Sequence, residues 1–280
     1  MIAVPFTNMA VSLSGGGYRA TSFHLGALSY LNARTYLDDP LLENVKILST
    51  ISGGTLTGVM YALKLAQGQS FLDCYQKLYF LLQDDKLVDL ALEKLNATKY
   101  WKNKHKNRDL INAFSEVYHE LFYDQASFQT LTEGKQTHLN DAIFGASEFT
   151  NGLQFRLQKV TDDGKFGDYY LSLPEEISNK IRLADAAASS SCFPGGFEPM
   201  IMPDDYGEGP NSPLNKTWTE KEYPRTAIMD GGIIDNQGII GVKLAEDRNA
   251  TEDQQYVGTY IVSDVCSQKM KPYIVPDYKN

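Results

Sequence analysis

The run Gly15-Gly16-Gly17-Tyr18-Arg19 decides how the first part of this chain folds. It follows an apolar run, Ala10 to Ser14, that predicts a strand, and it precedes a helix-like stretch from Phe23 to Leu31. Glycine allows a sharp turn with no Cβ in the way, so several N–H groups can point at one spot beside a helix N-terminus. The loop therefore suits an anion, which could be a phosphate or the oxyanion formed when a carbonyl is attacked.

A second strand-to-helix turn, at Ser52, favours the oxyanion. Val45 to Ile51 reads as a buried strand and Thr55 to Ala66 as a helix, with Ser52 between them. A serine on such a turn is the nucleophile elbow, usually written G-x-S-x-G. Here the pattern reads Thr50-Ile51-Ser52-Gly53-Gly54, so threonine replaces the first glycine, which requires room for a small side chain.

A nucleophilic serine needs a base, because its hydroxyl is weakly nucleophilic by itself. The chain has four histidines, and none follows a late strand, where α/β-hydrolases place theirs. They are His24, His105, His119 and His138. A better candidate is Asp230, which ends the apolar run Thr226 to Met229, precedes two glycines, and lies where parallel-sheet proteins build their sites. A helix cap or a turn residue is the alternative interpretation of this aspartate.

Taken together and in this order, these motifs resemble the patatin-like phospholipase family. The glycine loop (Gly15 to Arg19), the elbow (Thr50 to Gly54) and the D-G-G turn (Asp230 to Gly232) match its three hallmark motifs. Ala186 to Pro199 resembles its small-residue helix with a following F-P-G turn, and Ala146 to Leu157 resembles a family strand pair. The resemblance covers about residues 9 to 265.

The resemblance implies an α/β fold of three layers, α/β/α, with a mostly parallel central sheet. We expect residues 1–280 to form a single patatin-like phospholipase domain with a helical insertion at about 67–138, an amphipathic layer or lid. Family members often continue with further helices after a strand like the one expected at Tyr256 to Asp264. This leaves open that the chain is truncated at its C-terminus.

The resemblance also implies a mechanism without a catalytic histidine. Ser52 would be the nucleophile and Asp230 its base, in a dyad that forms an acyl-serine intermediate. The oxyanion hole would come from the glycine loop and from the residue after the nucleophile, and Arg19 would support the loop. The glycines implied are Gly15, Gly16, Gly17 and Gly53.

The function implied is that of a serine lipid acyl hydrolase, of the phospholipase A or lysophospholipase type, acting on a phospholipid or another acyl ester. A broader carboxylesterase or acyltransferase, and a catalytically silent lipid-binding homologue, are the alternatives. We expect no cofactor, because the dyad and the loop contain the required groups, and no nucleic-acid partner.

Composition agrees with an enzyme of this kind. The chain has 280 residues, 42% of them hydrophobic, and a net charge of −9. Its cysteines are widely spaced and odd in number, so neither a disulfide framework nor a metal site is expected; they are Cys74, Cys192 and Cys266. No apolar run is long enough to span a membrane and the first basic residue is Arg19, so we expect no signal peptide and a cytoplasmic or peripheral membrane location.

Three further segments carry predictions. Residues 99–108 hold five Lys or Arg, whereas the rest of the chain is acidic, which favours contact with an anionic membrane; a solvated loop is the alternative. Residues 202–221 read as a long polar loop, and Tyr256 to Asp264 reads as another buried strand.

Overall fold

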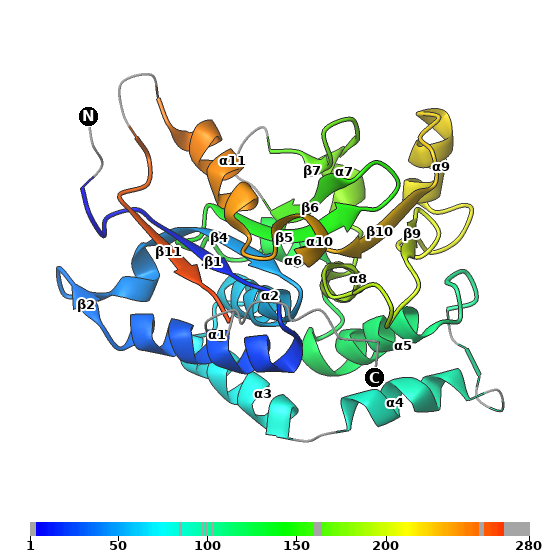
Figure 1. The fold of residues 1–280 in the computed structure, drawn as a ribbon, viewed down its shortest axis with the longest axis horizontal. Helices are drawn as coiled ribbons and strands as arrows, with labels where there is room; N and C mark the ends of the chain where they lie inside the picture. The colour runs from blue at the N-terminus through cyan, green and yellow to red at the C-terminus, as the bar shows by residue number, and fades with distance from the viewer. Residues whose placement is uncertain are drawn as a thin grey trace, which may run out of the picture.

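A mixed β-sheet runs through the middle of the molecule, and helices cover both of its faces (Figure 1). The structure is a computed structural model that describes residues 4–83, 86–96, 98, 100–101, 103–159, 164–251 and 255–265. Its strands are β1 (Met9–Leu13), β2 (Thr35–Tyr36), β3 (Asp39–Pro40), β4 (Val45–Ile51), β5 (Asp141–Glu148), β6 (Leu153–Lys159), β7 (Phe166–Gly167), β8 (Ser172–Leu173), β9 (Met200–Met202), β10 (Thr226–Asp230) and β11 (Thr259–Ser263).

Most of the helices are short, and the two longest, α1 and α2, follow the two glycine-containing turns. The α-helices are α1 (Gly17–Asn32), α2 (Gly53–Ala66), α3 (Phe71–Gln83), α4 (Leu87–Leu95), α5 (Leu110–Val117), α6 (Phe128–Glu133), α7 (Glu175–Ser178), α8 (Leu183–Ser190), α9 (Pro213–Glu220), α10 (Gly232–Asp235) and α11 (Ile239–Asn249). A 3₁₀ turn, η1 (Leu41–Asn44), and a π-helical turn, η2 (Tyr118–Phe122), complete the helical elements. No helix in the described part of the chain is both long and apolar enough to cross a membrane.

The centre of the sheet is parallel, and antiparallel strands extend it. The order is β11-β1-β4-β5-β6-β7-β8, with β11, β1, β4 and β5 all parallel to their neighbours in that group. Beyond β5 the pairs are antiparallel, and β10 pairs antiparallel with both β5 and β9. The expected three-layer α/β/α fold with a mostly parallel central sheet is confirmed, and so is the strand pair β5–β6.

Alternating side chains of the strands fill two separate cores. Along β1, Met9, Val11 and Leu13 face the larger core, which lies on the side of α2, whereas Ala10 faces a smaller core on the side of α11. Successive strand residues point to opposite faces, so each central strand serves both layers and reads as a continuous apolar run.

The geometry of the site follows from how β4 and β10 pair with one edge of β5. Ile51, the last residue of β4, pairs with Gly145, and Asp230, the last residue of β10, pairs with the next residue, Ala146. Because β4 runs parallel and β10 antiparallel to β5, their carboxyl ends meet head-on. The residues that follow, Ser52 and the Asp230 turn, are thereby brought together.

The structure corrects three of the expectations. Asp230 ends a short buried strand as expected, but that strand runs antiparallel to its neighbours. Residues 202–221 are not all loop, because Ser212 caps α9 by accepting from the Asn215 N–H and Trp218 is buried. The strand at Thr259–Ser263 is an edge strand with Tyr260 and Val262 exposed, because β1 is its only sheet neighbour among the described residues.

Within residues 67–138 the described segments are mostly helical, comprising α3, α4, α5, η2 and α6. Figure 1 places α3 and α4 at the outside of the layer that contains α1 and α5. The assignment of residues 1–280 to one domain stays a prediction.

The basic stretch 99–108 does not expose all of its charge, which corrects the simplest form of the membrane prediction. Lys106 is buried, and its Nζ lies 2.5 Å from a carboxylate oxygen of Asp185, at the start of α8. Arg182 binds the same carboxylate and also Glu116 of α5. Lys106 therefore belongs to an internal ion cluster, while Lys104 is exposed. Lys99 and Lys102 lie outside the described residues.

Candidate active site

Ser52 occupies a strained turn between β4 and α2. Its φ of 52° and ψ of −123° place a non-glycine residue in a sparsely populated region, which typically costs about 1–3 kcal/mol. Such a turn lifts the side chain out of the strand–helix corner, as in the nucleophile elbow. The residue is 7% exposed and lines a cavity.

The two glycines after Ser52 are required by the close approach of the glycine loop. A Cβ on Gly53 would overlap the carbonyl oxygen of Gly17, and a Cβ on Gly54 would lie 2.5 Å from that of Leu13. Thr50 stands where the usual elbow pattern has a glycine. Its methyl group fits because residue 58 is a glycine, and a Cβ on Gly58 would overlap that methyl group. The glycine loop and the start of α2 are thus packed backbone against backbone.

Ser190, at the end of α8, holds the elbow from the other side. Its hydroxyl donates to the Gly145 carbonyl at 2.6 Å, so its oxygen is left to accept from the Ser52 N–H at 2.9 Å and from the Thr55 hydroxyl at 2.7 Å. Thr55 in turn lies 3.0 Å from the hydroxyl of Thr50. The serine run around Ser190 resembles a family motif, and its sequence alone assigns no role to Ser190. The contact joins residues 138 positions apart, so local pattern could not reveal it.

The segment after Ser190 also fixes Asp230. The Asp230 N–H donates to the Cys192 carbonyl at 2.9 Å, and the Gly231 N–H donates to the Ser190 carbonyl. The Asp230 carboxylate accepts from the Gly232 N–H at 2.7 Å. Burial raises the pKa of Asp230 above its usual value, and the hydrogen bonds from the Ser52 hydroxyl and the Gly232 N–H oppose that rise only in part.

The glycine loop contributes Gly16 and Gly17 to the lining of the cavity, and Gly15 does not line it. The Gly15 N–H donates to the Asn236 carbonyl at 2.9 Å, which removes Gly15 from the expected set of oxyanion donors. Gly16 and Gly17, with φ of 143° and 63°, line the cavity together with Gly53. No described residue accepts a hydrogen bond from their N–H groups. Arg19 is exposed in the first turn of α1 and does not line the cavity, so its supporting role stays a prediction.

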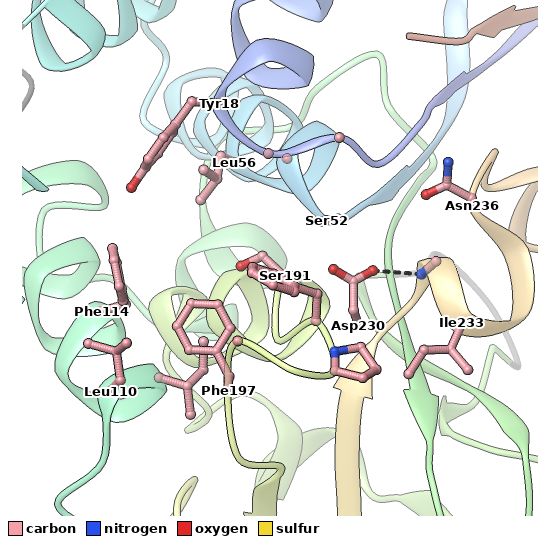
Figure 2. Close-up of a pocket in the computed structure, with 18 of the residues that line it drawn as sticks. Tyr18, Ser52, Leu56, Leu110, Phe114, Ser191, Phe197, Asp230, Ile233 and Asn236 are labelled. Atoms are coloured by element: carbon pink, nitrogen blue, oxygen red, sulfur yellow. Dashed lines mark hydrogen bonds between the residues drawn. The ribbon is translucent and has the colours of Figure 1, made fainter. Parts of the chain in front are cut away.

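Ser52 and Asp230 lie in a cavity of about 700 Å³. In Figure 2 the Asp230 carboxylate points toward the Ser52 turn, and Leu110, Phe114 and Phe197 form the opposite side. The lining is mostly apolar, with side chains from α2, α4, α5 and the turn after α8. A cavity of this size and character suits a ligand with a substantial apolar part.

None of the four histidines, all of which the structure describes, lines this cavity. His24 is fully buried behind the glycine loop, and His138 is held by Tyr61 and Glu43. Cys74 and Cys192 are buried thiols, as expected, and burial raises the pKa of each to about 12. Cys266 lies outside the described residues.

Comparison with known families agrees with this geometry. The family model described as patatin-like phospholipase matches residues 11–242, which include the glycine loop, the elbow and the Asp230 turn. A search of curated proteins gives no significant match. Since the family model covers most of its length, the chain belongs to the patatin-like phospholipase family.

Proposed function

We propose that this chain is a serine lipid acyl hydrolase, of the phospholipase A or lysophospholipase type, that works through a Ser52–Asp230 dyad. Its family is one of lipid acyl hydrolases. The observation that carries the proposal is the pairing of a strained, cavity-lining Ser52 with a buried Asp230, in a cavity that no histidine lines.

In the first step the Ser52 Oγ attacks the ester carbonyl carbon while Asp230 accepts the hydroxyl proton. The carbonyl oxygen becomes an oxyanion, and the N–H groups of Gly16, Gly17 and Gly53 are the donors available to it. One such donor typically contributes about 3 kcal/mol to the transition state. When the tetrahedral intermediate collapses, Asp230 returns its proton to the leaving alcohol and Ser52 keeps the acyl group.

In the second step water replaces the alcohol. Asp230 takes a proton from the water molecule while the water oxygen attacks the carbonyl carbon of the acyl-serine. The oxyanion forms at the same place as in the first step. When this intermediate collapses, Asp230 returns the proton to the Ser52 oxygen and the fatty acid leaves. A carboxylate is a weak base at neutral pH, so the raised pKa of Asp230 brings it closer to the range in which base catalysis is efficient.

The apolar side of the cavity supports an acyl chain as the part of the substrate that is bound there. Leu56, Leu110, Phe114 and Phe197 surround space next to Ser52. Burying an acyl chain contributes roughly 0.8 kcal/mol for each methylene removed from water. The remainder of the ester would point to the open mouth, where Val88, Phe193 and Ile233 are exposed.

We also propose peripheral contact with an anionic membrane through about residues 99–108, made by the exposed residues of that stretch and not by the buried Lys106. Within the described residues, the exposed side chains of that stretch include Tyr100, Lys104 and Arg108. Lys104 lies over the Tyr100 ring at 5.4 Å, which presents a cation together with an aromatic surface.

The test is release of fatty acid from phosphatidylcholine and lysophosphatidylcholine, and from a soluble short-chain ester, by wild type, Ser52→Ala and Ser49→Ala. Ser49 is the matched control, because it is a buried serine on β4, the strand that leads into Ser52, and its hydroxyl has no hydrogen-bond partner among the described residues. We expect wild type and Ser49→Ala to hydrolyse lipid and Ser52→Ala to be inactive. Full activity in Ser52→Ala would overturn the proposal, and lipid binding without turnover by wild type would instead favour the silent homologue.

A further inference from the structure

The segment Ser263–Val265 lies beyond the residues that the family model matches, yet it reaches the glycine loop. Strand β11 pairs in parallel with β1, and their last paired residues are Ser263 and Leu13. The chain then continues past the end of β1, where Ser14 begins the turn into the glycines. Ser14 is fully buried there.

Every hydrogen-bonding atom of Ser14 has a partner. Its N–H donates to the Ser263 carbonyl at 3.0 Å, and its Oγ accepts from the Val265 N–H at 3.0 Å and lies 3.3 Å from the Gly15 carbonyl. Its own carbonyl accepts from Nε2 of His24 at 2.8 Å. Ser14, which begins the turn into the glycine loop, is thus held by α1 and by the segment Ser263–Val265.

His24 connects these two elements through a single tautomer. A carbonyl oxygen can only accept, so the Nε2 that faces Ser14 carries the proton. Burial lowers the pKa of His24 and favours the neutral ring, whose Nδ1 then accepts from the Ser263 hydroxyl at 2.8 Å. The order of donation is therefore from Ser263 to His24 and from His24 to the Ser14 carbonyl.

The same segment is tied to the residues that follow Asp230. Gln237 donates to the Asp264 carboxylate at 2.6 Å, and its neighbour Asn236 accepts the Gly15 N–H. The segment after β11 therefore contacts both halves of the site: the loop that carries the oxyanion donors and the turn that follows the base.

We propose that Ser263 and His24 are positioning residues for the reaction: they hold the Ser14–Gly15 turn so that the N–H groups of Gly16 and Gly17 point at the oxyanion. The inference rests on the proposed function, because it concerns the oxyanion of that same site. It gives Ser263, the last residue of β11, a part in catalysis, and it gives His24 a role distinct from that of a base.

The test uses the full chain with Ser263→Ala, His24→Leu and His24→Gln, assayed for kcat and KM on a soluble short-chain ester. A displacement of about 1 Å in such a loop can cost roughly a hundredfold in rate, so we expect kcat to fall about tenfold in Ser263→Ala and up to about a hundredfold in His24→Leu. KM should change little, because the oxyanion exists only in the transition state. His24→Gln should recover most of the His24→Leu loss, since the glutamine amide can donate to the Ser14 carbonyl as Nε2 does.

Two controls separate positioning from general damage. Ser12→Ala removes a buried hydroxyl on β1 that has no hydrogen-bond partner in the described part of the chain, and Thr259→Val alters β11 at its far end. Both should keep wild-type kcat. A trifluoromethyl ketone, which forms an oxyanion with the serine, should bind more weakly to Ser263→Ala by about the factor lost in kcat/KM.

The outcomes also distinguish this inference from the proposed function. Hydrolysis that requires Ser52 but is unchanged in folded Ser263→Ala and His24→Leu proteins would overturn the positioning role and leave the dyad standing. If His24→Leu does not fold, Ser263→Ala decides the matter. Hydrolysis that does not require Ser52 would overturn the proposed function itself.

Discussion

Two buried aspartates, Asp185 at the start of α8 and Asp230 in the strand that bonds to the segment just after α8, lie in contrasting environments. Burial alone would raise the pKa of Asp185, but the charges of Arg182 and Lys106 outweigh it and hold that pKa far below its usual range. Asp230 has no cation within ion-pair distance among the described residues, and burial raises its pKa. A buried carboxylate with two cations is a structural anion, whereas one with only hydrogen-bond donors can take up a proton.

The two ends of α8 are held by different kinds of interaction. The start of α8 is fixed by the ion cluster with Glu116, and its end, at Ser190, meets the elbow through neutral hydrogen bonds. No charged side chain of α8, all of whose residues the structure describes, lines the cavity. The residues of the ion cluster do not line the cavity either, so the cluster holds α8 in place without adding charge to the cavity.

The largest effect should come from removing the base. Asp230→Asn should reduce hydrolysis of a soluble ester by a factor on the order of 10⁴, because the side chain can no longer take the Ser52 proton. The melting temperature should hardly change, since the asparagine oxygen can still accept from the Gly232 N–H. Turnover and thermal unfolding measured on the same preparation check both statements. Substantial activity in Asp230→Asn would mean that another group is the base.

The next largest effect concerns stability. Asp185→Asn leaves the buried Lys106 and the partly buried Arg182 with too little negative charge, and breaking a buried pair in this way typically costs about 3–5 kcal/mol. Urea unfolding should show that loss. The matched control is Asp204→Asn, because Asp204 pairs with Arg225 at the surface and such pairs contribute about 0–1 kcal/mol. Equal losses in the two variants would show that the buried cluster does not stabilise the fold.

A pH titration should separate the two aspartates. Asp230 must be ionised to accept a proton, so kcat/KM should fall as the pH decreases through a value above the usual 3.8. Asp185 has a lowered pKa in the folded state, so its contribution to stability is present above the unfolded pKa of about 4 and is lost only as pH falls below that value. Activity should therefore disappear while the protein is still folded. An acid limb that coincides with unfolding would contradict this order.

The smallest expected effect tests the exposed part of the basic stretch 99–108. Lys104→Gln should weaken binding to anionic vesicles by about 1 kcal/mol, or roughly fivefold, and the difference should shrink at high salt. Lys106→Gln should not change vesicle binding in this way but should lower stability, because Lys106 is paired with Asp185 inside the protein. Vesicle binding that is indifferent to Lys104→Gln would leave the exposed part of the stretch as a solvated loop.

Local sequence signals were enough to predict the central elements. Apolar runs that end in glycine turns predict β4 and β10, the stretch after Ser52 predicts α2, and the resemblance to the patatin-like phospholipase family implies the fold class. The capping pair Ser212-Pro213 and the apolar residues Leu214 and Trp218 are helix signals in the sequence of α9, but the polar composition of the segment around them predicts a loop.

What the sequence could not reveal depends on contacts between distant residues. Ser263 meets His24 across 239 positions, and Lys106 meets Asp185 across 79. No local pattern indicates that one lysine of a basic run is buried. Nor does a local pattern indicate that a serine hydroxyl at the end of a helix accepts a hydrogen bond from the N–H of Ser52. The antiparallel direction of β10 is equally non-local, since it is set by its pairing with β5.

The measurement that tests the central claim most directly is labelling by a fluorophosphonate probe, with the modified residue mapped by mass spectrometry. Ser52 is predicted to be the labelled residue in wild type, to remain labelled in His105→Gln, His119→Gln and His138→Gln, and to react far more slowly in Asp230→Asn. Labelling of Ser52 that is unaffected by Asp230→Asn but abolished by one of these histidine substitutions would contradict the dyad, and so would the absence of any label on Ser52 in the active protein.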